Sequence, residues 1–294
     1  MKKQLLFLTA FSFFLIIFFQ TTLTAQSLSP ERVAKIKSAT VRITIENSAS
    51  MGTGFLVSND GTLITCWHVI EPSLSRDSLL RIISGKKIFG EFNSGEKLEF
   101  KILLYFIQAG NKDAVAYDYC ILSPVTQQKR IFPFLKVGNF DKTDEGQEIY
   151  TCGYPLGYPQ QFISKGIIST KYIDNSNVIN IGNQNKIVMP RSQALLDLTM
   201  NRGNSGGAII KLGETVNDDE VIGIADFIIN PIGGIADQLI KSFDQSSGGV
   251  LISGVDPNAT FSLFAKLLTQ TSIGVGGCIS VNYVLGGYNS AMKK

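Results

Sequence analysis

The chain has 294 residues, 44% of them hydrophobic and 17% charged, with a formal net charge of +3. This apolar content is too high for a disordered chain, and 27 basic residues against 24 acidic ones indicate no nucleic-acid partner. The 28 glycines indicate many turns. His68 is the single histidine, so any histidine chemistry must use it.

Residues 1–25 have the composition of a secretory signal peptide. Two lysines open the segment, residues 5–19 are mostly apolar, and Ala25 fits the last position before cleavage. If this segment stayed uncleaved, residues 5–25 would be long enough to anchor the chain in a membrane. Both interpretations place the globular part outside the cytoplasm, in the periplasm or secreted, with membrane contact only through an uncleaved anchor.

The rest of the chain is dominated by strand patterns. A short helix-compatible run at 30–37 comes first, and apolar and polar residues then alternate at 41–46 and 98–104, as in half-buried strands. Further β-rich runs, separated by turn signals, occur at 54–58, 62–66, 79–83, 118–122, 148–152, 162–170, 208–212 and 221–229. Many short strands with few helices predict an all-β fold of sandwich or barrel type.

A polar stretch at 139–147 divides the chain after the signal segment into two β units, residues 26–142 and 143–294. The second unit contains a stretch without strand patterns, residues 230–272, where Asp256 and Pro257 predict the start of a helix. Its apolar residues fall on one helical face, which we expect to pack on a barrel. These residues are Phe261, Phe264, Ala265 and Leu268.

All four cysteines lie in apolar, strand-like runs, where a free thiol behaves as a small core residue. Disulfides are possible in an exported protein, and four cysteines allow three pairings that the sequence does not rank. We expect buried, free thiols at Cys66, Cys120, Cys152 and Cys278. No Cys or His spacing indicates a metal site, and we expect no cofactor.

Three local signals become informative together: Thr65-Cys66-Trp67-His68, Asp118 at the start of an apolar run, and Gly203-Asn204-Ser205-Gly206-Gly207. Each has an ordinary structural explanation when taken singly. Together they supply one mechanism, because a serine nucleophile needs an imidazole base and the imidazole needs a buried carboxylate. The sequence therefore predicts Ser205 as nucleophile, His68 as general base and Asp118 as orienting acid.

The order of these residues separates the possible folds. Gly203-x-Ser205-x-Gly207 also fits the nucleophile elbow of α/β-hydrolases, but that fold places its histidine after the serine. The subtilisin order would need an acid before His68, and Asp60 lies in a predicted hairpin turn. The order histidine, aspartate, serine is that of chymotrypsin-type double β-barrels.

On these residues the chain resembles the trypsin-like serine peptidases, and within them the bacterial HtrA/Deg-like branch. The resemblance covers about residues 31–229 and 273–288, and we expect no PDZ domain after it. The matching motifs lie at 52–58, 63–69, 118–122, 166–169, 197–207, 221–224 and 276–282. It implies two six-stranded antiparallel β-barrels and a serine endopeptidase that cleaves proteins or peptides through an acyl-enzyme.

The resemblance also implies roles for residues around the nucleophile. The oxyanion hole would use Gly203, Asn204 and Ser205, and the substrate-binding residues would be Thr199, Ala225, Asp226 and Phe227. Asp226 could favour a basic substrate side chain, but we expect it to point to solvent. The preferred residue at the cleaved position is then small or medium-sized and apolar.

Several positions depart from the family pattern. Cys66 and Trp67 stand where that branch usually has Asn and Ala, so the bulky Trp67 could narrow the cleft beside the base. Asn204 replaces the aspartate that digestive enzymes pair with a newly freed N-terminus, so we expect no such activation. Asp113 is a rival to Asp118, which we prefer because the residues after it match the Asp-x-Ala-x-Leu pattern.

Two other functions remain open at this point. One is a binding module that keeps the fold without useful catalysis, favoured by Trp67 and by the unmatched insertion. The other is an esterase that uses the same three residues, because a fold does not determine a substrate.

Overall fold

The computed structural model describes residues 28–76, 82–107, 115–126, 130–176, 178–181, 185–230, 233–245, 251–252, 254–268 and 274–285. The segment for which export or anchoring is expected, residues 1–25, lies outside them. In the part that is described, no helix combines the length and apolar character needed to cross a bilayer.

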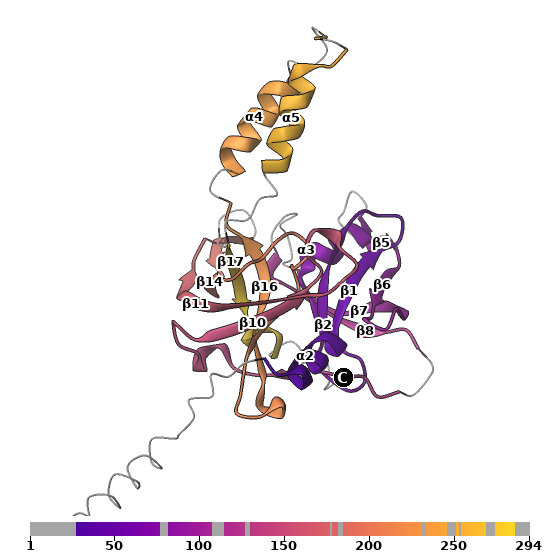
Figure 1. The fold of residues 1–294 in the computed structure, drawn as a ribbon, viewed down its shortest axis with the longest axis vertical. Helices are drawn as coiled ribbons and strands as arrows, with labels where there is room; N and C mark the ends of the chain where they lie inside the picture. Colours follow the sequence, from indigo (N-terminus) through magenta and orange to yellow (C-terminus); the bar gives the residue numbers. More distant parts are fainter. Residues whose placement is uncertain are drawn as a thin grey trace, which may run out of the picture.

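The first barrel follows a short helix, α2 (Pro30–Ala39), which confirms the helix expected near residue 30. The Ser29 hydroxyl caps it by accepting a hydrogen bond from the Arg32 amide, and Pro30 occupies the first turn, where its missing N–H costs nothing. Six antiparallel strands then close in the order β1-β2-β3-β8-β7-β6 (Figure 1). They are β1 (Thr40–Ile45), β2 (Met51–Leu56), β3 (Leu63–Thr65), β6 (Ile88–Glu91), β7 (Lys97–Ile107) and β8 (Val115–Pro124).

The second barrel also has six antiparallel strands, in the order β15-β10-β11-β14-β17-β16, and closes through the pairing of β15 with β16. They are β10 (Glu148–Gly153), β11 (Phe162–Asp174), β14 (Arg191–Asp197), β15 (Ala208–Lys211), β16 (Glu220–Ile228) and β17 (Val275–Ser280). The short strand β9 (Lys136–Val137) adds to β16 in parallel. The predicted all-β fold with two barrels is therefore confirmed.

Smaller elements decorate the barrels. Two hairpins pair β4 (Leu74–Arg76) with β5 (Ile82–Gly85) and β12 (Val178–Ile181) with β13 (Asn185–Val188). One helical turn, α3 (Trp67–Ile70), and four 3-10 turns complete the barrels. The 3-10 turns are η1 (Glu71–Ser73), η2 (Phe140–Lys142), η3 (Pro155–Gly157) and η4 (Val216–Asp218).

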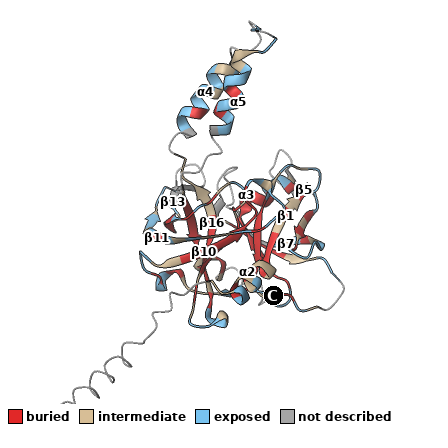
Figure 2. Cartoon of the chain, viewed as in Figure 1, coloured by how far each residue is buried: buried red, intermediate tan, exposed pale blue. Residues whose placement is uncertain are grey.

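The core follows the alternation seen in the sequence. On β1, the apolar residues Val41, Ile43 and Ile45 are all buried. One buried cluster fills the first barrel and continues into the second, and another fills the interior of the second barrel (Figure 2). The four cysteines are buried and free, which confirms the expectation from sequence.

Residues 230–272 contain a helical hairpin, α4 (Gly233–Gln245) and α5 (Pro257–Leu268), that projects away from both barrels (Figure 1). The predicted cap is confirmed, because the Asp256 carboxylate accepts a hydrogen bond from the Asn258 amide at 2.8 Å. The prediction that α5 packs its apolar face on a barrel is wrong. Phe261 and Phe264 are 55% and 59% exposed, and Phe261 stacks on Phe243 of α4.

Replacing residues 231–273 with an Asn-Gly turn is expected to leave the barrels folded. The Ile229 amide already donates to the Val275 carbonyl at 3.0 Å, so β16 and β17 meet at the base of the hairpin. A surface change of this kind shifts stability by roughly 0.5 kcal/mol, which is about 1–2 °C in Tm for a domain of this size. Thermal unfolding followed by circular dichroism measures the shift.

A core substitution supplies the control. Trp67→Ala opens a cavity at a side chain that is only 1% exposed, and should lower stability by about 3–5 kcal/mol. Loss of cooperative unfolding in the deletion variant would show that the hairpin is part of the folding unit.

Candidate active site

His68 and Asp118 come together because β3 and β8 are paired strands. Thr65 at the end of β3 lies opposite Cys120 of β8, and the chain then turns into α3, which carries His68. The Asp118 carboxylate accepts two hydrogen bonds from His68, one from its backbone amide at 2.9 Å and one from ring Nδ1. This double contact orients the imidazole and leaves Nε2 for a substrate-side proton. Asp113, the rival acid, lies outside the described residues.

The two groups shift each other's protonation. Burial lowers the pKa of His68, but the hydrogen bond and charge of Asp118, together with the charge of Glu71, outweigh it and raise that pKa above its usual 6.5. Burial raises the pKa of Asp118, yet its bonds to His68 prevail and lower it. Asp118 therefore stays ionised at neutral pH, and His68 is a stronger base than a free imidazole.

Ser205 lies in the loop between β14 and β15, where two glycines define the backbone path. Gly203 has φ +99° and Gly206 has φ +85°, a region that strains other residues. A Cβ atom at Gly203 would overlap the Tyr154 carbonyl oxygen, and one at Gly206 would overlap the Thr53 carbonyl oxygen. Both positions need glycine for conformation and for space.

Thr53 of β2 joins this loop to the first barrel. Its amide donates to the Ser205 carbonyl at 2.9 Å, and its hydroxyl donates to the Gly203 carbonyl at 2.6 Å. The same hydroxyl accepts a hydrogen bond from the Tyr154 amide at 3.1 Å. The serine loop of the second barrel is thus fixed against the barrel that carries His68.

The predicted oxyanion donors differ in their present partners. The Asn204 amide donates to the Asn201 carbonyl at 3.0 Å, so it already closes a turn. Within the described ranges, no hydrogen bond engages the amides of Gly203 or Ser205. These two amides are the ones available to a negatively charged oxygen.

The Ser205 hydroxyl donates to the backbone carbonyl of Asp226 at 3.4 Å. Among the hydrogen bonds of the described residues it has none to His68. Catalytic hydrogen bonds are often long or misaligned without substrate, and a rotation about the Cα–Cβ bond of serine redirects its hydroxyl.

Asp226 does not point to solvent, and that expectation is wrong. It is the extra residue of a β-bulge, because the register with β17 slips between Ala225 and Phe227. A bulge redirects a side chain that regular alternation would send the other way. The Asp226 carboxyl instead lies within 4.8 Å of the ligand atoms of Asp118 and His68.

Donor atoms of Cys66, His68, Asp118 and Asp226 all lie within 4.8 Å of one another. These are atom types that bind zinc, but a metal site would require the thiol and the imidazole nitrogen to be free for coordination. The Cys66 thiol is fully buried, has a raised pKa and donates to the Ala225 carbonyl at 3.2 Å. The His68 Nδ1 atom is engaged by Asp118. The hydrogen bonds of the cluster therefore match an oriented imidazole better than a metal site.

Trp67 does not narrow the cleft, contrary to the concern raised by its position. It packs in the core of the first barrel and is 1% exposed. His68 beside it points the other way, with its side chain 46% exposed. One of the two arguments for an inactive protein is thereby removed.

A cleft of about 250 Å³ is lined by Ser205, Asp226 and Phe227. Its other lining residues, Asn201, Arg202, Ile228 and Asn230, were not anticipated. Asn201 and Arg202 directly precede the glycine-rich motif, so their place in the sequence was a usable signal.

Two of the predicted substrate residues do not line this cleft. Thr199 is exposed, and Ala225 is fully buried. Phe227 lies over Gly277, where a Cβ atom would overlap its ring.

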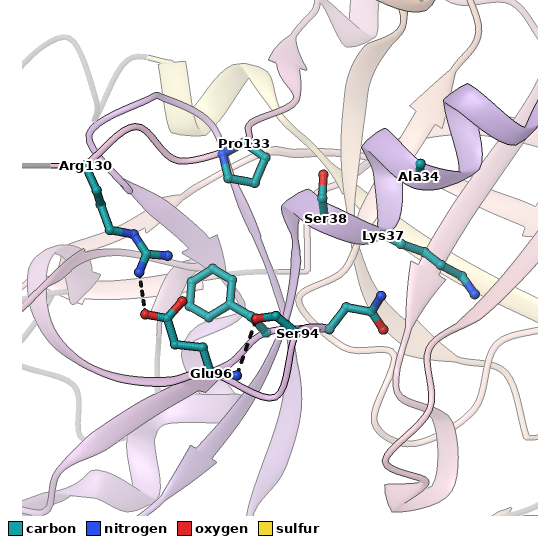
Figure 3. Close-up of a pocket in the computed structure, with 9 residues that line it drawn as sticks. Ala34, Lys37, Ser38, Ser94, Glu96, Arg130 and Pro133 are labelled. Carbon is teal, nitrogen blue, oxygen red and sulfur yellow. Dashed lines mark hydrogen bonds and ion pairs between the residues drawn. The ribbon is translucent and has the colours of Figure 1, made fainter.

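Two other hollows lie in the described part of the barrels. One of about 350 Å³ is lined by Gly203 and Arg202 of the serine loop, together with Met51 and Leu156. Another of about 430 Å³ lies between α2 and the β6–β7 turn. Figure 3 shows Arg130 and Glu96 paired across it, and none of its lining residues belongs to the candidate site.

Comparison with known proteins agrees with this geometry. Residues 52–224, more than half of the chain, match the model of the trypsin-like peptidase domain. The chain belongs to this family. The match runs from the start of β2 to the middle of β16, and so includes His68, Asp118 and Ser205.

Curated relatives include proteins named "Probable periplasmic serine endoprotease DegP-like". The one from Chlamydia muridarum is 27% identical over 228 residues, which are 72% of this chain and 38% of that one. The one from Halomonas elongata is 28% identical over 227 residues, 71% of this chain and 40% of that one. The chain thus spans about two fifths of the length of these relatives.

Solved structures share the fold. The HtrA-type protease AlgW with a tripeptide has a TM-score of 0.51 and 17% identity, over 88% of this chain and 62% of that one. An inactive form of Rv3671c from M. tuberculosis has a TM-score of 0.53 and 16% identity, over 90% and 91% of the two chains.

Gly203→Ala should abolish measurable turnover, because the added methyl group must displace the Tyr154 carbonyl and with it the nearby Gly203 amide. The matched control is Gly95→Ala. Gly95 has a similar φ of +84° but no atom within 4 Å of the added Cβ, so only backbone strain of about 1 kcal/mol is expected there. Turnover of a denatured protein, measured with thermal unfolding, separates the two effects. Equal activity losses in both variants would contradict the steric explanation.

Proposed function

We propose that this protein is an exported serine endopeptidase. The observation that carries the proposal is the doubly bonded His68–Asp118 pair in a trypsin-like double barrel, whose serine loop with Ser205 is hydrogen-bonded through Thr53 to the barrel that carries His68. The names of the curated relatives support peptide-bond hydrolysis and a periplasmic location. The N-terminal signal pattern supports export independently.

The proposed mechanism begins with rotation of the Ser205 hydroxyl from the Asp226 carbonyl toward His68. The serine oxygen attacks the substrate carbonyl while His68 Nε2 takes its proton, and Asp118 stabilises the resulting imidazolium. The amides of Gly203 and Ser205 stabilise the negative oxygen. His68 then protonates the leaving amine, and a water molecule activated by His68 hydrolyses the acyl-enzyme.

The cleft supports a small or medium-sized apolar residue at the cleaved position. Phe227 and Ile228 supply apolar surface beside Ser205. Asp226 also lines the cleft, but its carboxyl lies within 4.8 Å of the ligand atoms of Asp118 and His68, where we propose it pairs with Asp118 and not with a basic substrate side chain. An apolar substrate residue therefore loses less hydration in this cleft than a charged one.

A binding module without catalysis remains the second candidate, because the Ser205 hydroxyl bonds to Asp226 and not to His68. In such a protein the serine would stay in this position when a peptide binds. The two candidates differ in whether Ser205 reacts.

A fluorophosphonate probe should label the wild-type protein at Ser205, since only an activated serine reacts quickly with it. Ser205→Ala should lose labelling and lower kcat by about 10⁶-fold. Ser94→Ala, a change in an exposed turn, serves as the control and should label normally. Unlabelled wild-type protein that still binds peptides would favour the binding module.

The raised pKa of His68 predicts an acid limb in kcat/KM. Protonated His68 cannot act as base, so activity should fall as pH decreases through a value above 6.5. Asp118→Asn should lower kcat by roughly 10⁴-fold and move this limb to lower pH, because the charge that raises the pKa is gone. Rates measured with one peptide between pH 5 and 8 test both points; an acid limb unaffected by Asp118→Asn would contradict the assignment.

A further inference from the structure

We propose that Asp226 is a positioning residue, a neutral carboxyl group that donates a hydrogen bond to Asp118 and keeps Asp118 aligned on His68. This inference rests on the proposed peptidase function and adds a fourth side chain to its machinery. It replaces the substrate-binding role that sequence alone suggested for this residue.

The geometry places two carboxyl groups side by side. Asp226 is the extra residue of the β-bulge, and its carboxyl lies within 4.8 Å of the ligand atoms of His68, Asp118 and Cys66. Two ionised carboxylates this close repel each other, and neither has a hydrogen to donate. A neutral carboxyl instead donates a hydrogen bond to an ionised one, and we therefore assign one proton to the pair.

That proton belongs to Asp226, because the two carboxyls have different partners. Asp118 accepts two hydrogen bonds from His68, and both favour its ionised form. Asp226 has no comparable donor, and burial, the charge of Asp118 and the shared hydrogen bond raise its pKa to about 8. The pair therefore carries one negative charge at neutral pH.

The other groups that face Asp226 do not change the assignment of the proton to Asp226. The Cys66 and Cys278 thiols and the Tyr172 hydroxyl all have raised pKa values, so they are neutral there. Arg191 acts on Asp226 only weakly, and its guanidinium is paired with Asp174 at 2.6 Å. Protonated His68 is the main group that favours an ionised Asp226.

Loss of the Asp226 proton has two consequences for the site. Asp118 loses a donor and gains a like charge at contact distance, so its alignment on His68 is no longer favoured. The Asp226 carboxylate can then compete with Asp118 for the His68 Nδ1 proton. Because the Asp226 carbonyl also binds the Ser205 hydroxyl, a shift of this residue affects base and nucleophile together. Activity should fall as pH rises through about 8.

The activity test is the alkaline limb of kcat/KM. Wild-type protein should lose activity above about pH 8, whereas Asp226→Asn should lack this limb, because its amide donates at every pH. Asp226→Ala should lower kcat roughly 10-fold or more with little change in KM, since a hydrogen bond to a charged group is lost. An alkaline limb that persists in Asp226→Asn, or a loss confined to KM, would overturn the proposal.

Glu71→Gln is the matched control, because Glu71 also raises the pKa of His68 by its charge but does not belong to the group of Cys66, His68, Asp118 and Asp226, whose ligand atoms lie within 4.8 Å of one another. This variant should shift the acid limb to lower pH and keep the alkaline limb. Loss of the alkaline limb in Glu71→Gln would assign that limb to general electrostatics and overturn the role of Asp226. Circular dichroism measured at each pH shows whether the loss of activity at alkaline pH is caused by unfolding.

A second readout does not require activity. His68 is the only histidine in the sequence. In a protein labelled with ¹⁵N-histidine, all imidazole signals therefore come from His68 and need no assignment. Its shifts should show two inflections with pH in the wild type and one in Asp226→Asn; a single inflection in both would overturn the proposal even if no substrate is cleaved. The spectrum should not change with EDTA, because a change would mean that a metal ion and not a proton lies between the carboxyls. Fluorophosphonate labelling of Ser205 reports the peptidase function separately.

Discussion

The site depends on Thr53. This residue of the first barrel, which also carries His68, is hydrogen-bonded to the serine loop of the second barrel. Its amide and hydroxyl donate to the carbonyls of Ser205 and Gly203, and its own carbonyl accepts a hydrogen bond from the Thr65 hydroxyl at 2.7 Å. Thr65 ends β3, directly before the turn that carries His68. Two strands of the first barrel and the nucleophile of the second are therefore linked through one buried threonine.

The electrostatics of the site follow from one imidazole among two half-buried carboxyls. With a single positive charge available, only one carboxyl gains by being ionised, and Asp118 has the better donors. Asp226 then contributes through hydrogen bonding and not through charge. Its backbone carbonyl accepts a hydrogen bond from the Ser205 hydroxyl, and its carboxyl lies within 4.8 Å of the Asp118 ligand atom. One residue of β16 therefore contacts both Ser205 and the partner of His68.

Much of the fold was predictable, because alternating patterns such as Val41, Ile43 and Ile45 report burial directly. The packing of α5 was not. An amphipathic face predicts that something covers it, but not which element, and here α4 provides the partner by stacking Phe243 on Phe261 at 5.4 Å between ring centroids. Several apolar side chains of the hairpin stay exposed, Phe264 among them.

The sequence by itself determined which residues we propose for the chemistry. A single histidine, the order His68, Asp118, Ser205 and the glycines around the serine limit the choice of family, because those requirements are chemical and local. Only the tertiary structure decided the orientation of side chains. The register slip against β17 makes Asp226 the extra residue of a bulge, and the fold brings its carboxyl within 4.8 Å of the ligand atoms of His68 and Asp118. Register depends on a strand that is distant in sequence, and for that reason it could not be deduced from the motif alone.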